Sequence, residues 1–119
     1  MILVDTSVWI DHIRRSDPEL TELLIAGKVL IHPFVIGELA LGSIRDSDRL
    51  LREMRKLPAI VVARDDEVLW LITNYALGGS GIGYVDAHLL AAVRLTPGSV
   101  LWTRDRRLAI VSDRLSGAC

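Results

Sequence analysis

The sequence has little of several features that mark common classes of protein. It has one cysteine, Cys119, which excludes an internal disulfide and favours a reducing compartment, so we expect a cytoplasmic protein. Its apolar runs fall far short of the ~20 residues that cross a bilayer. Asp5 interrupts the first of them, so we expect neither a membrane span nor a signal peptide. The net charge of −1 gives no sign of a generally basic, nucleic-acid-binding surface.

Aromatic residues are also scarce, at 5%, although half of the 119 residues are hydrophobic. The apolar content is therefore mainly aliphatic and large enough for a packed core, which excludes a disordered chain. We expect Trp9, Trp70 and Trp102, which stand among aliphatic residues, to lie in that core. At about 150 residues per domain, residues 1–119 are expected to form a single domain.

Short apolar runs alternate with longer segments of helical periodicity. The runs show no alternation of polar and apolar residues, as in strands buried on both faces of a parallel sheet. We expect strands at 2–4, 29–31, 59–62 and 100–102. We expect helices at 7–14, 19–26, 33–42, 47–56, 65–77, 85–94 and 105–111. This order predicts an α/β fold, a three-layer α/β/α sandwich around a central parallel sheet.

Most acidic residues lie on polar stripes and are expected to form exposed ion pairs, as Asp11 would with Arg14 or Arg15. Three others have apolar neighbours in the sequence. Asp5 follows the first strand, and Glu38 belongs to a helix that is apolar almost all round and is therefore expected to be buried.

Asp86 is the third such acid, near a helix start, and Asp105 follows the last strand. Each acid has a structural alternative, except that a mid-helix glutamate such as Glu38 has no helix end to cap. Asp5 and Asp86 could cap helices, and Asp105 could cap a helix or pair with a neighbouring arginine.

The four acids also share a place in the predicted topology. Open α/β sheets bind ligands at the carboxyl ends of their strands, where these residues can converge. Two carboxylates about 4 Å apart repel by about 4 kcal/mol at an effective dielectric constant near 20, so such a cluster requires a cation. An all-oxygen ligand set suits Mg²⁺, or alternatively Mn²⁺, and serves phosphodiester hydrolysis by activated water.

Four segments carry a family resemblance: MILVDTSVW at 1–9, PFVIGELALG at 33–42, GYVDAHLL at 83–90 and LWTRDRRL at 101–108. In this order and spacing they resemble the four acidic motifs of the PIN domain. More closely, the chain is similar to the VapC toxins of bacterial type II toxin–antitoxin modules. Any one segment alone would be a weak signal, but together they are highly specific, and the resemblance spans nearly the whole chain.

The resemblance implies a magnesium-dependent ribonuclease. Asp5, Glu38 and Asp86 match the principal metal-binding and catalytic acids, and Asp105 matches a fourth acid whose role varies more. The hydroxyl side chains that match supporting positions are those of Thr6, Ser7 and Thr103.

The resemblance further implies an RNA substrate, a VapB-type antitoxin that inhibits the site and binds operator DNA, and a toxin homodimer. Many relatives end in a short edge strand, whereas residues 112–119 hardly suggest one, so the sheet is expected to have four or five strands.

Three other patterns are less specific. The glycine-rich segment 78–83 lacks the Lys-Ser/Thr of a phosphate-binding loop and is interpreted as a hinge, with RNA backbone contact as the alternative. The histidines lack the spacing of zinc ligands, and His32 is expected to be a satisfied strand-end residue rather than one at the mouth of the site.

Arginine supplies all but two of the 14 cationic residues. A stripe at helical spacing is interpreted as a solvated face, with contact to RNA or to an acidic antitoxin segment as the alternative; it comprises Arg45, Arg49, Arg52 and Lys56. The residues beside Asp105 are better placed to bind substrate: Arg104, Arg106 and Arg107.

Two competing functions remain at this stage. A phosphotransfer enzyme is disfavoured, because a dehalogenase-like phosphatase would need a second aspartate where Ser7 stands, and a receiver domain would need an aspartate ending the third strand. A catalytically silent RNA- or protein-binding module is disfavoured because it would have no need for four repelling acids.

Overall fold

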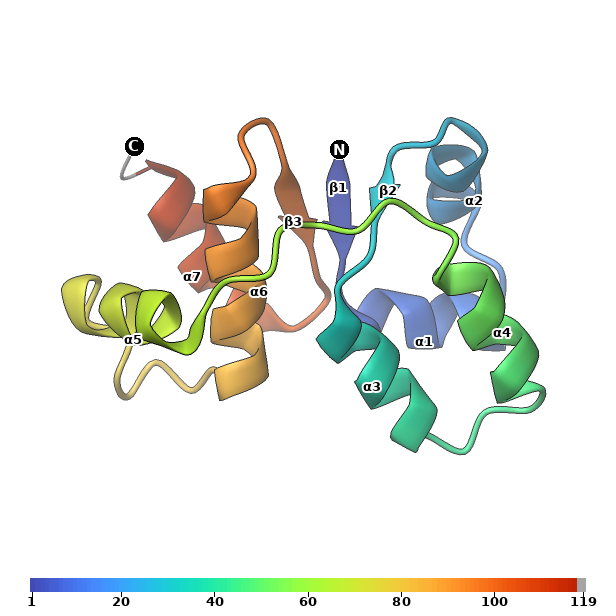
Figure 1. The fold of residues 1–119 in the computed structure, drawn as a ribbon, viewed down its shortest axis with the longest axis horizontal. Coiled ribbons are helices and arrows are strands. Elements are labelled where there is room, and N and C mark those ends of the chain that lie inside the picture. Colours follow the sequence, from blue (N-terminus) through green and yellow to red (C-terminus); the bar gives the residue numbers. More distant parts are fainter. Residues whose placement is uncertain (118–119) are drawn as a thin grey trace.

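The computed structural model describes residues 1–117, so Cys119 lies outside the described part. Within this part, three strands and seven helices follow one another (Figure 1). They are β1 (Ile2–Val4), α1 (Thr6–Arg14), α2 (Pro18–Ile25), β2 (Val29–Leu30), α3 (Pro33–Leu41), α4 (Ser47–Met54), α5 (Asp65–Asn74), α6 (Tyr84–Leu95), β3 (Val100–Trp102) and α7 (Arg106–Gly117).

The strands form one parallel sheet in the order β2-β1-β3. Ile2 of the central strand β1 lies opposite Val29 on one side and Val100 on the other. Leu3 and Val4 are fully buried, as the unbroken apolar run predicts for a strand covered on both faces. The sheet brings the carboxyl ends of β1 and β3 together, and the residues after them are neighbours.

The predicted strand at 59–62 is wrong. A single parallel bridge joins Ala59 to Ile31, and the segment then leaves the sheet. The segment after Ile31 offers no further pairing, because Pro33 lacks an N–H and begins α3. Among residues 1–117 the sheet therefore has three strands rather than the expected four or five, while the mixed α/β class with a parallel sheet is confirmed.

Helices pack on both sides of this small sheet. Figure 1 shows α5, α6 and α7 beside β3, and α1 to α4 around β1 and β2. One apolar cluster joins the sheet to α1–α4 and to Leu89 of α6, and a second fills the space between α5, α6 and α7. Leu101 of β3 packs against both clusters, so the strand that precedes Asp105 is held from two sides.

Helix α3 is less buried than its composition predicts. Val35 and Leu39 are buried, but Phe34 is 37% exposed and Leu41 is 90% exposed. The small sheet has room for only one face of the helix, so the opposite apolar face has no covering element within residues 1–117. Glu38 consequently lies at the surface and not in the core.

Two further expectations need correction. Helix α7 continues to Gly117 instead of ending at residue 111, so residues 112–117 are helical and form no edge strand. Its buried stripe of Leu108, Val111 and Leu115 explains the extension, since it keeps helical spacing past residue 111. Trp70 is 53% exposed on α5 and is not a core residue, whereas Trp9 is buried.

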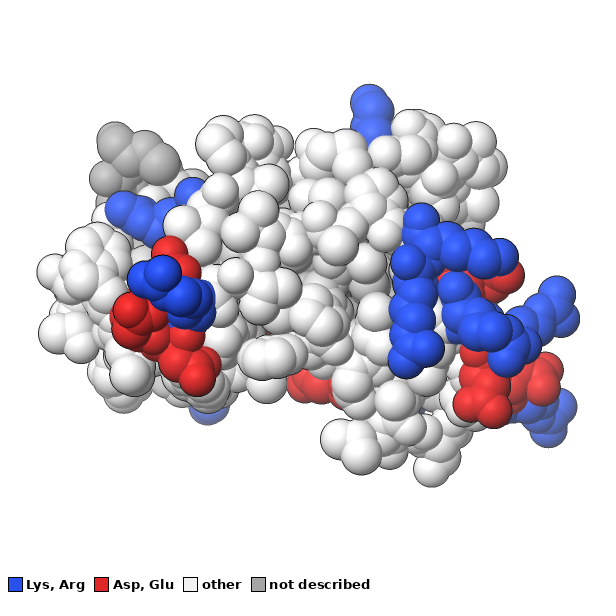
Figure 2. Space-filling view, in the orientation of Figure 1, with Lys and Arg blue, Asp and Glu red and all other residues white. Residues whose placement is uncertain are grey.

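Charge is distributed unevenly over the surface. Figure 2 shows Lys and Arg side chains gathered on the side of the molecule occupied by α4, with a largely uncharged centre between them and α5. The predicted stripe of Arg45, Arg49, Arg52 and Lys56 is exposed there. No helix in the described part of the chain is long and apolar enough to cross a membrane.

Candidate active site

Asp5 lies at the carboxyl end of β1 and is buried, with 6% exposure. It occupies the N-cap position of α1, yet its side chain makes no capping hydrogen bond. Two hydroxyl groups donate instead to its Oδ2 atom, Ser7 Oγ at 2.7 Å and Thr103 Oγ1 at 2.8 Å. The expected alternative of a side-chain cap is therefore wrong, and the carboxylate is held by hydroxyls from two parts of the chain.

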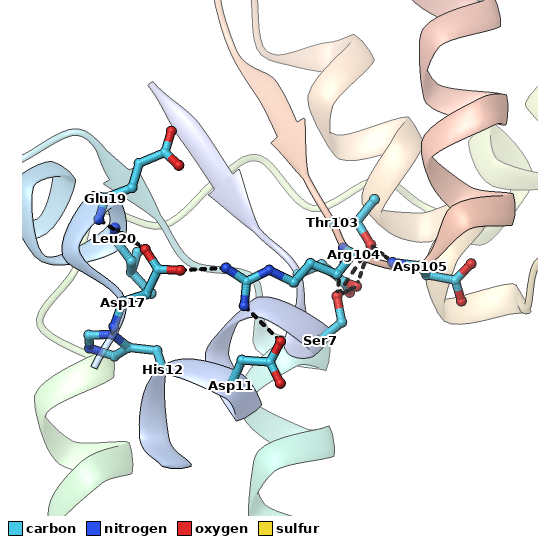
Figure 3. Close-up of polar contacts among 10 residues, drawn as sticks. Ser7, Asp11, His12, Asp17, Glu19, Leu20, Thr103, Arg104 and Asp105 are labelled. Atoms are coloured by element: carbon cyan, nitrogen blue, oxygen red, sulfur yellow. Dashed lines mark hydrogen bonds and ion pairs between the residues drawn. The ribbon is translucent and has the colours of Figure 1, made fainter. Parts of the chain in front are cut away.

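The hydroxyls that hold Asp5 also join the turns after β1 and β3 (Figure 3). Thr103 Oγ1 accepts a hydrogen bond from the N–H of Asp105 at 3.0 Å, and Ser7 Oγ accepts one from the N–H of Arg104 at 3.0 Å. Each hydroxyl thus donates to the carboxylate and accepts from the backbone. This fixes the position of Asp105 relative to Asp5 across nearly the whole length of the sequence.

Glu38 approaches the same edge of the sheet from α3. Its Oε1 atom accepts a hydrogen bond from Thr6 Oγ1 at 2.7 Å, and Thr6 is the residue after Asp5. Two residues of the predicted supporting set therefore contact two different acids, Thr6 with Glu38 and Ser7 with Asp5.

Asp86 is half-buried at the third residue of α6. Its Oδ2 atom accepts a hydrogen bond from the N–H of Gly83 at 2.9 Å, which fits the expected capping alternative. Burial raises the pKa of the Asp86 carboxyl, and the nearby carboxylates of Asp5 and Asp105 raise this pKa further, while the Gly83 hydrogen bond acts in the opposite direction. Asp86 is thus close enough to Asp5 and to Asp105 for both carboxylates to act on its charge.

Asp105 is exposed just before α7. Its Oδ1 atom accepts a hydrogen bond from the N–H of Leu108 at 3.1 Å, so it caps this helix as the structural alternative predicts. Capping uses one oxygen of the carboxylate and leaves the negative charge in place beside Asp86.

The acids stand near one another without forming a finished ligand set. Among residues 1–117, no group of three His, Cys, Asp or Glu side chains is arranged to hold a metal ion. The side chains of Glu38, Asp86 and Asp105 are instead turned toward local donors. Carboxylate oxygens are nevertheless the ligands that hard divalent cations prefer, and a cation would relieve the repulsion that Asp5 and Asp105 exert on Asp86.

Of the three arginines beside Asp105, Arg104 is already engaged. Its guanidinium pairs with Asp11 at 2.7 Å and also with Asp17 (Figure 3). It also lies over the ring of Trp102. The hydrogen bonds to Asp11 and Asp17 raise the pKa of Arg104. Asp11 therefore pairs across the fold and not with Arg14 or Arg15, which the sequence spacing cannot reveal.

Two buried histidines, His32 and His88, have ring centroids 6.5 Å apart. His32 is fully buried, and its Nδ1 atom accepts a hydrogen bond from the N–H of Phe34 at 3.0 Å, capping α3. Its Nε2 atom has no hydrogen-bond partner among residues 1–117. Burial lowers the pKa of His32 to about 4, with a further contribution from His88. One ring nitrogen of His32 is thus hydrogen-bonded, as expected for a satisfied strand-end histidine, and the other is not.

His88 follows Asp86 by two positions and is also buried. Its Nε2 atom lies 3.2 Å from Oδ1 of Asp65, which also accepts a hydrogen bond from the hydroxyl of Tyr84 at 3.1 Å. This contact joins α5 to α6. The spacing of Tyr84 and His88 on one helix face was visible in the sequence, but Asp65 lies too far along the chain to be assigned as their partner.

Comparison with known proteins agrees with the geometry. The family model described as PIN domain matches residues 2–113. The chain is similar to Ribonuclease VapC32 of two Mycobacterium tuberculosis strains, CDC 1551 / Oshkosh and ATCC 25618 / H37Rv. Each is 52% identical over 108 residues, which cover 91% of this chain and 87% of the relative. The family match spans all four acids, and the chain belongs to the PIN-domain family.

Proposed function

We propose that this protein is an endoribonuclease that hydrolyses RNA phosphodiester bonds with the help of a divalent metal ion. The observation that carries the proposal is the gathering of carboxylates at one edge of the sheet: Thr103 joins Asp5 to the turn of Asp105, and both acids act on the charge of half-buried Asp86. Such a cluster is unfavourable by itself and becomes favourable around a cation. The similarity to proteins named Ribonuclease VapC32 supports RNA as the substrate.

Asp5, Asp86 and Asp105 would hold the metal ion, with Glu38 approaching from α3. The oxygen-only donors fit Mg²⁺, with Mn²⁺ as the alternative. When bound, the ion would supply a deprotonated water and neutralise negative charge on the phosphate. The protein's own contribution is positional: Ser7 and Thr103 fix the Asp5 carboxylate, and Thr6 fixes that of Glu38.

The same proposal extends to partners. We infer a toxin of a type II toxin–antitoxin module, acting in the cytoplasm as a homodimer of chains that each form one PIN domain over residues 1–119. A VapB-type antitoxin would inhibit the site, and operator DNA would be bound only through it. The exposed apolar face of α3, including Phe34 and Leu41, provides a surface that a second copy can cover.

A groove beside Glu38 suits an inhibitory segment of the antitoxin. One hollow is lined by Glu38, Ile13 and Ile44, among others, and an adjoining hollow shares both isoleucines and reaches Arg49. A segment with apolar side chains and a following acidic stretch would fill both, with its acids on the exposed arginines of α4. Under this proposal the arginine stripe would contact the antitoxin, which is one of the two alternatives to a solvated face.

The test of the proposed activity uses Asp5→Asn and Glu38→Gln, which keep side-chain size and remove charge. We expect each to lower the rate of Mg²⁺-dependent cleavage of purified total RNA by at least about a hundredfold, as for loss of one preorganised catalytic group. The matched control is Glu22→Gln on α2, an exposed acid remote from β1's carboxyl end, which should cleave normally.

Circular dichroism would establish that all variants are folded. Full activity in both Asp5→Asn and Glu38→Gln would refute the proposed site. Absence of cleavage by the unaltered protein with Mg²⁺ or Mn²⁺, together with retained RNA or protein binding, would instead support the silent binding module.

A further inference from the structure

The glycine-rich segment before α6 contains a contact that its hinge interpretation does not explain. Gly81 has φ +88°, in the left-handed region. A Cβ atom built on it would lie 2.8 Å from Cδ, 3.2 Å from Nε and 3.1 Å from Nη1 of Arg107. The arginine side chain therefore rests directly on the glycine backbone. Gly79, with a similar φ of +78°, has nothing within 4 Å of the same built atom.

Arg107 reaches this position from the second residue of α7. Its neighbour Arg104 is held by two aspartates, but no ion pair or side-chain hydrogen bond within residues 1–117 engages the Arg107 guanidinium. The side chain is exposed. It is thus ordered by packing against Gly81 while its hydrogen-bond donors stay available to a ligand.

The contact joins two segments that each carry or position an acid of the candidate site. Arg107 follows Asp105 by two residues, and Gly81 precedes by two residues Gly83, whose N–H binds Asp86. The guanidinium therefore bridges the turn that carries Asp105 and the turn that positions Asp86. A strand of RNA whose reacting phosphate lies at the aspartates would pass this bridge.

We propose that Arg107, seated on Gly81, binds a phosphate of the RNA strand next to the one that is cleaved. The inference rests on the proposed ribonuclease function and adds a substrate-binding residue to it. A planar guanidinium can donate two parallel hydrogen bonds to a phosphate, which makes arginine well suited to this contact. A side chain at position 81 would push the guanidinium out of this position, because its Cβ atom would lie 2.8 Å from Cδ of Arg107.

The central test compares Gly81→Ala with Gly79→Ala. Both place alanine at a positive φ and so carry a similar backbone cost, but only the methyl group at position 81 collides with Arg107. Binding of a short mixed-sequence single-stranded RNA is measured in a Glu38→Gln background, so that the RNA is not consumed. Thermal unfolding of each variant checks that the backbone cost is matched.

We expect Arg107→Ala to raise the Kd about tenfold, as for loss of one charge-assisted hydrogen-bonding group. The slope of log K against log salt should fall in magnitude by about 0.7, the value for one phosphate contact on a single strand. Gly81→Ala should weaken binding in the same direction and Gly79→Ala should not. The double variant Gly81→Ala with Arg107→Ala should bind like Arg107→Ala alone, and Arg107→Lys should bind more tightly than Arg107→Ala.

An unchanged Kd and salt slope in Arg107→Ala would overturn the inference, as would equal weakening by the two glycine variants. Either result combined with RNA cleavage by the otherwise unaltered protein leaves the ribonuclease function standing. If the unaltered protein neither binds nor cleaves RNA, the proposed function and this inference both fall.

Discussion

At the scale of single residues, the site depends on hydroxyl groups that carboxylates recruit from distant parts of the chain. Asp5 takes two donors, one from Ser7 and one from Thr103, and both act on the same oxygen. Hydrogen bonds to a charged acceptor are shorter and stronger than neutral ones, so the carboxylate is held in one orientation. The buried carboxylate therefore stays in a fixed position at the carboxyl end of β1.

His32 gives a pH prediction at this scale. Its folded pKa is about 4, well below the ordinary 6.5, because the ring is buried. The folded state therefore takes up a proton less readily than the unfolded state, and the free energy of unfolding falls as pH drops from 6.5 toward 4. Between pH 7 and pH 5 this group alone should remove about 2 kcal/mol.

The His32 prediction is checked by urea unfolding of the unaltered protein and of His32→Asn at both pH values. Asparagine keeps a side-chain acceptor for the Phe34 N–H at the start of α3 but does not titrate. The variant should lose less stability on acidification by about the same 2 kcal/mol. An identical acid sensitivity in both proteins would show that His32 is not neutral and buried in solution.

At the scale of elements, the sequence predicts best what local patterns determine. The apolar runs at β1 and β3 and the Asp17-Pro18 start of α2 are confirmed, since Asp17 accepts from the N–H groups of Glu19 and Leu20. The predicted strand at 59–62 is wrong because its pairing depended on the segment around Ile31, which ends where α3 begins at Pro33.

For the candidate site too, the sequence predicts local features better than long-range contacts. The four acids could be singled out because each has a distinctive local sequence, but their contacts could not. The bond from Thr103 to Asp5 spans 98 positions, and that from Arg104 to Asp11 spans 93. The exposure of Glu38 also depends on how many elements cover α3, which its own apolar neighbours do not reveal.

Arg104 gives the element-scale prediction, because it ties the turn after β3 to α1 and to the start of α2. Arg104→Ala removes its pairs with Asp11 and Asp17. We expect the melting temperature to fall by a few degrees at low salt, and less at high salt, since partly exposed ion pairs are screened.

The Arg104 test has Arg114→Ala as its control, an exposed arginine whose partner is the backbone oxygen of Tyr75 and not a carboxylate. Its effect on the melting temperature should change little with salt. A salt-independent loss in Arg104→Ala would mean that packing on Trp102, and not charge, accounts for the stability.

At the scale of the whole molecule, the acids lie on elements that contribute to different apolar clusters. Asp5 belongs to the β1–α1 turn, Asp86 to α6 and Asp105 to the start of α7, and these elements contribute to two separate apolar clusters. A cation bound between the three aspartates would join both clusters through one ion. Metal binding should therefore stabilise the whole fold and not only a loop.

This predicts that Mg²⁺ raises the melting temperature of the unaltered protein. An ion that binds only the folded state stabilises it by about 2.7 kcal/mol at a concentration of 100 times its Kd. The rise should be absent in Asp5→Asn and retained in Glu22→Gln; an equal rise in both variants would place the ion elsewhere.

The stabilisation by Mg²⁺ should also fade on acidification. Because the pKa of Asp86 is raised, its carboxyl is protonated at a pH where an ordinary aspartate still carries its charge, and the proton then displaces the metal.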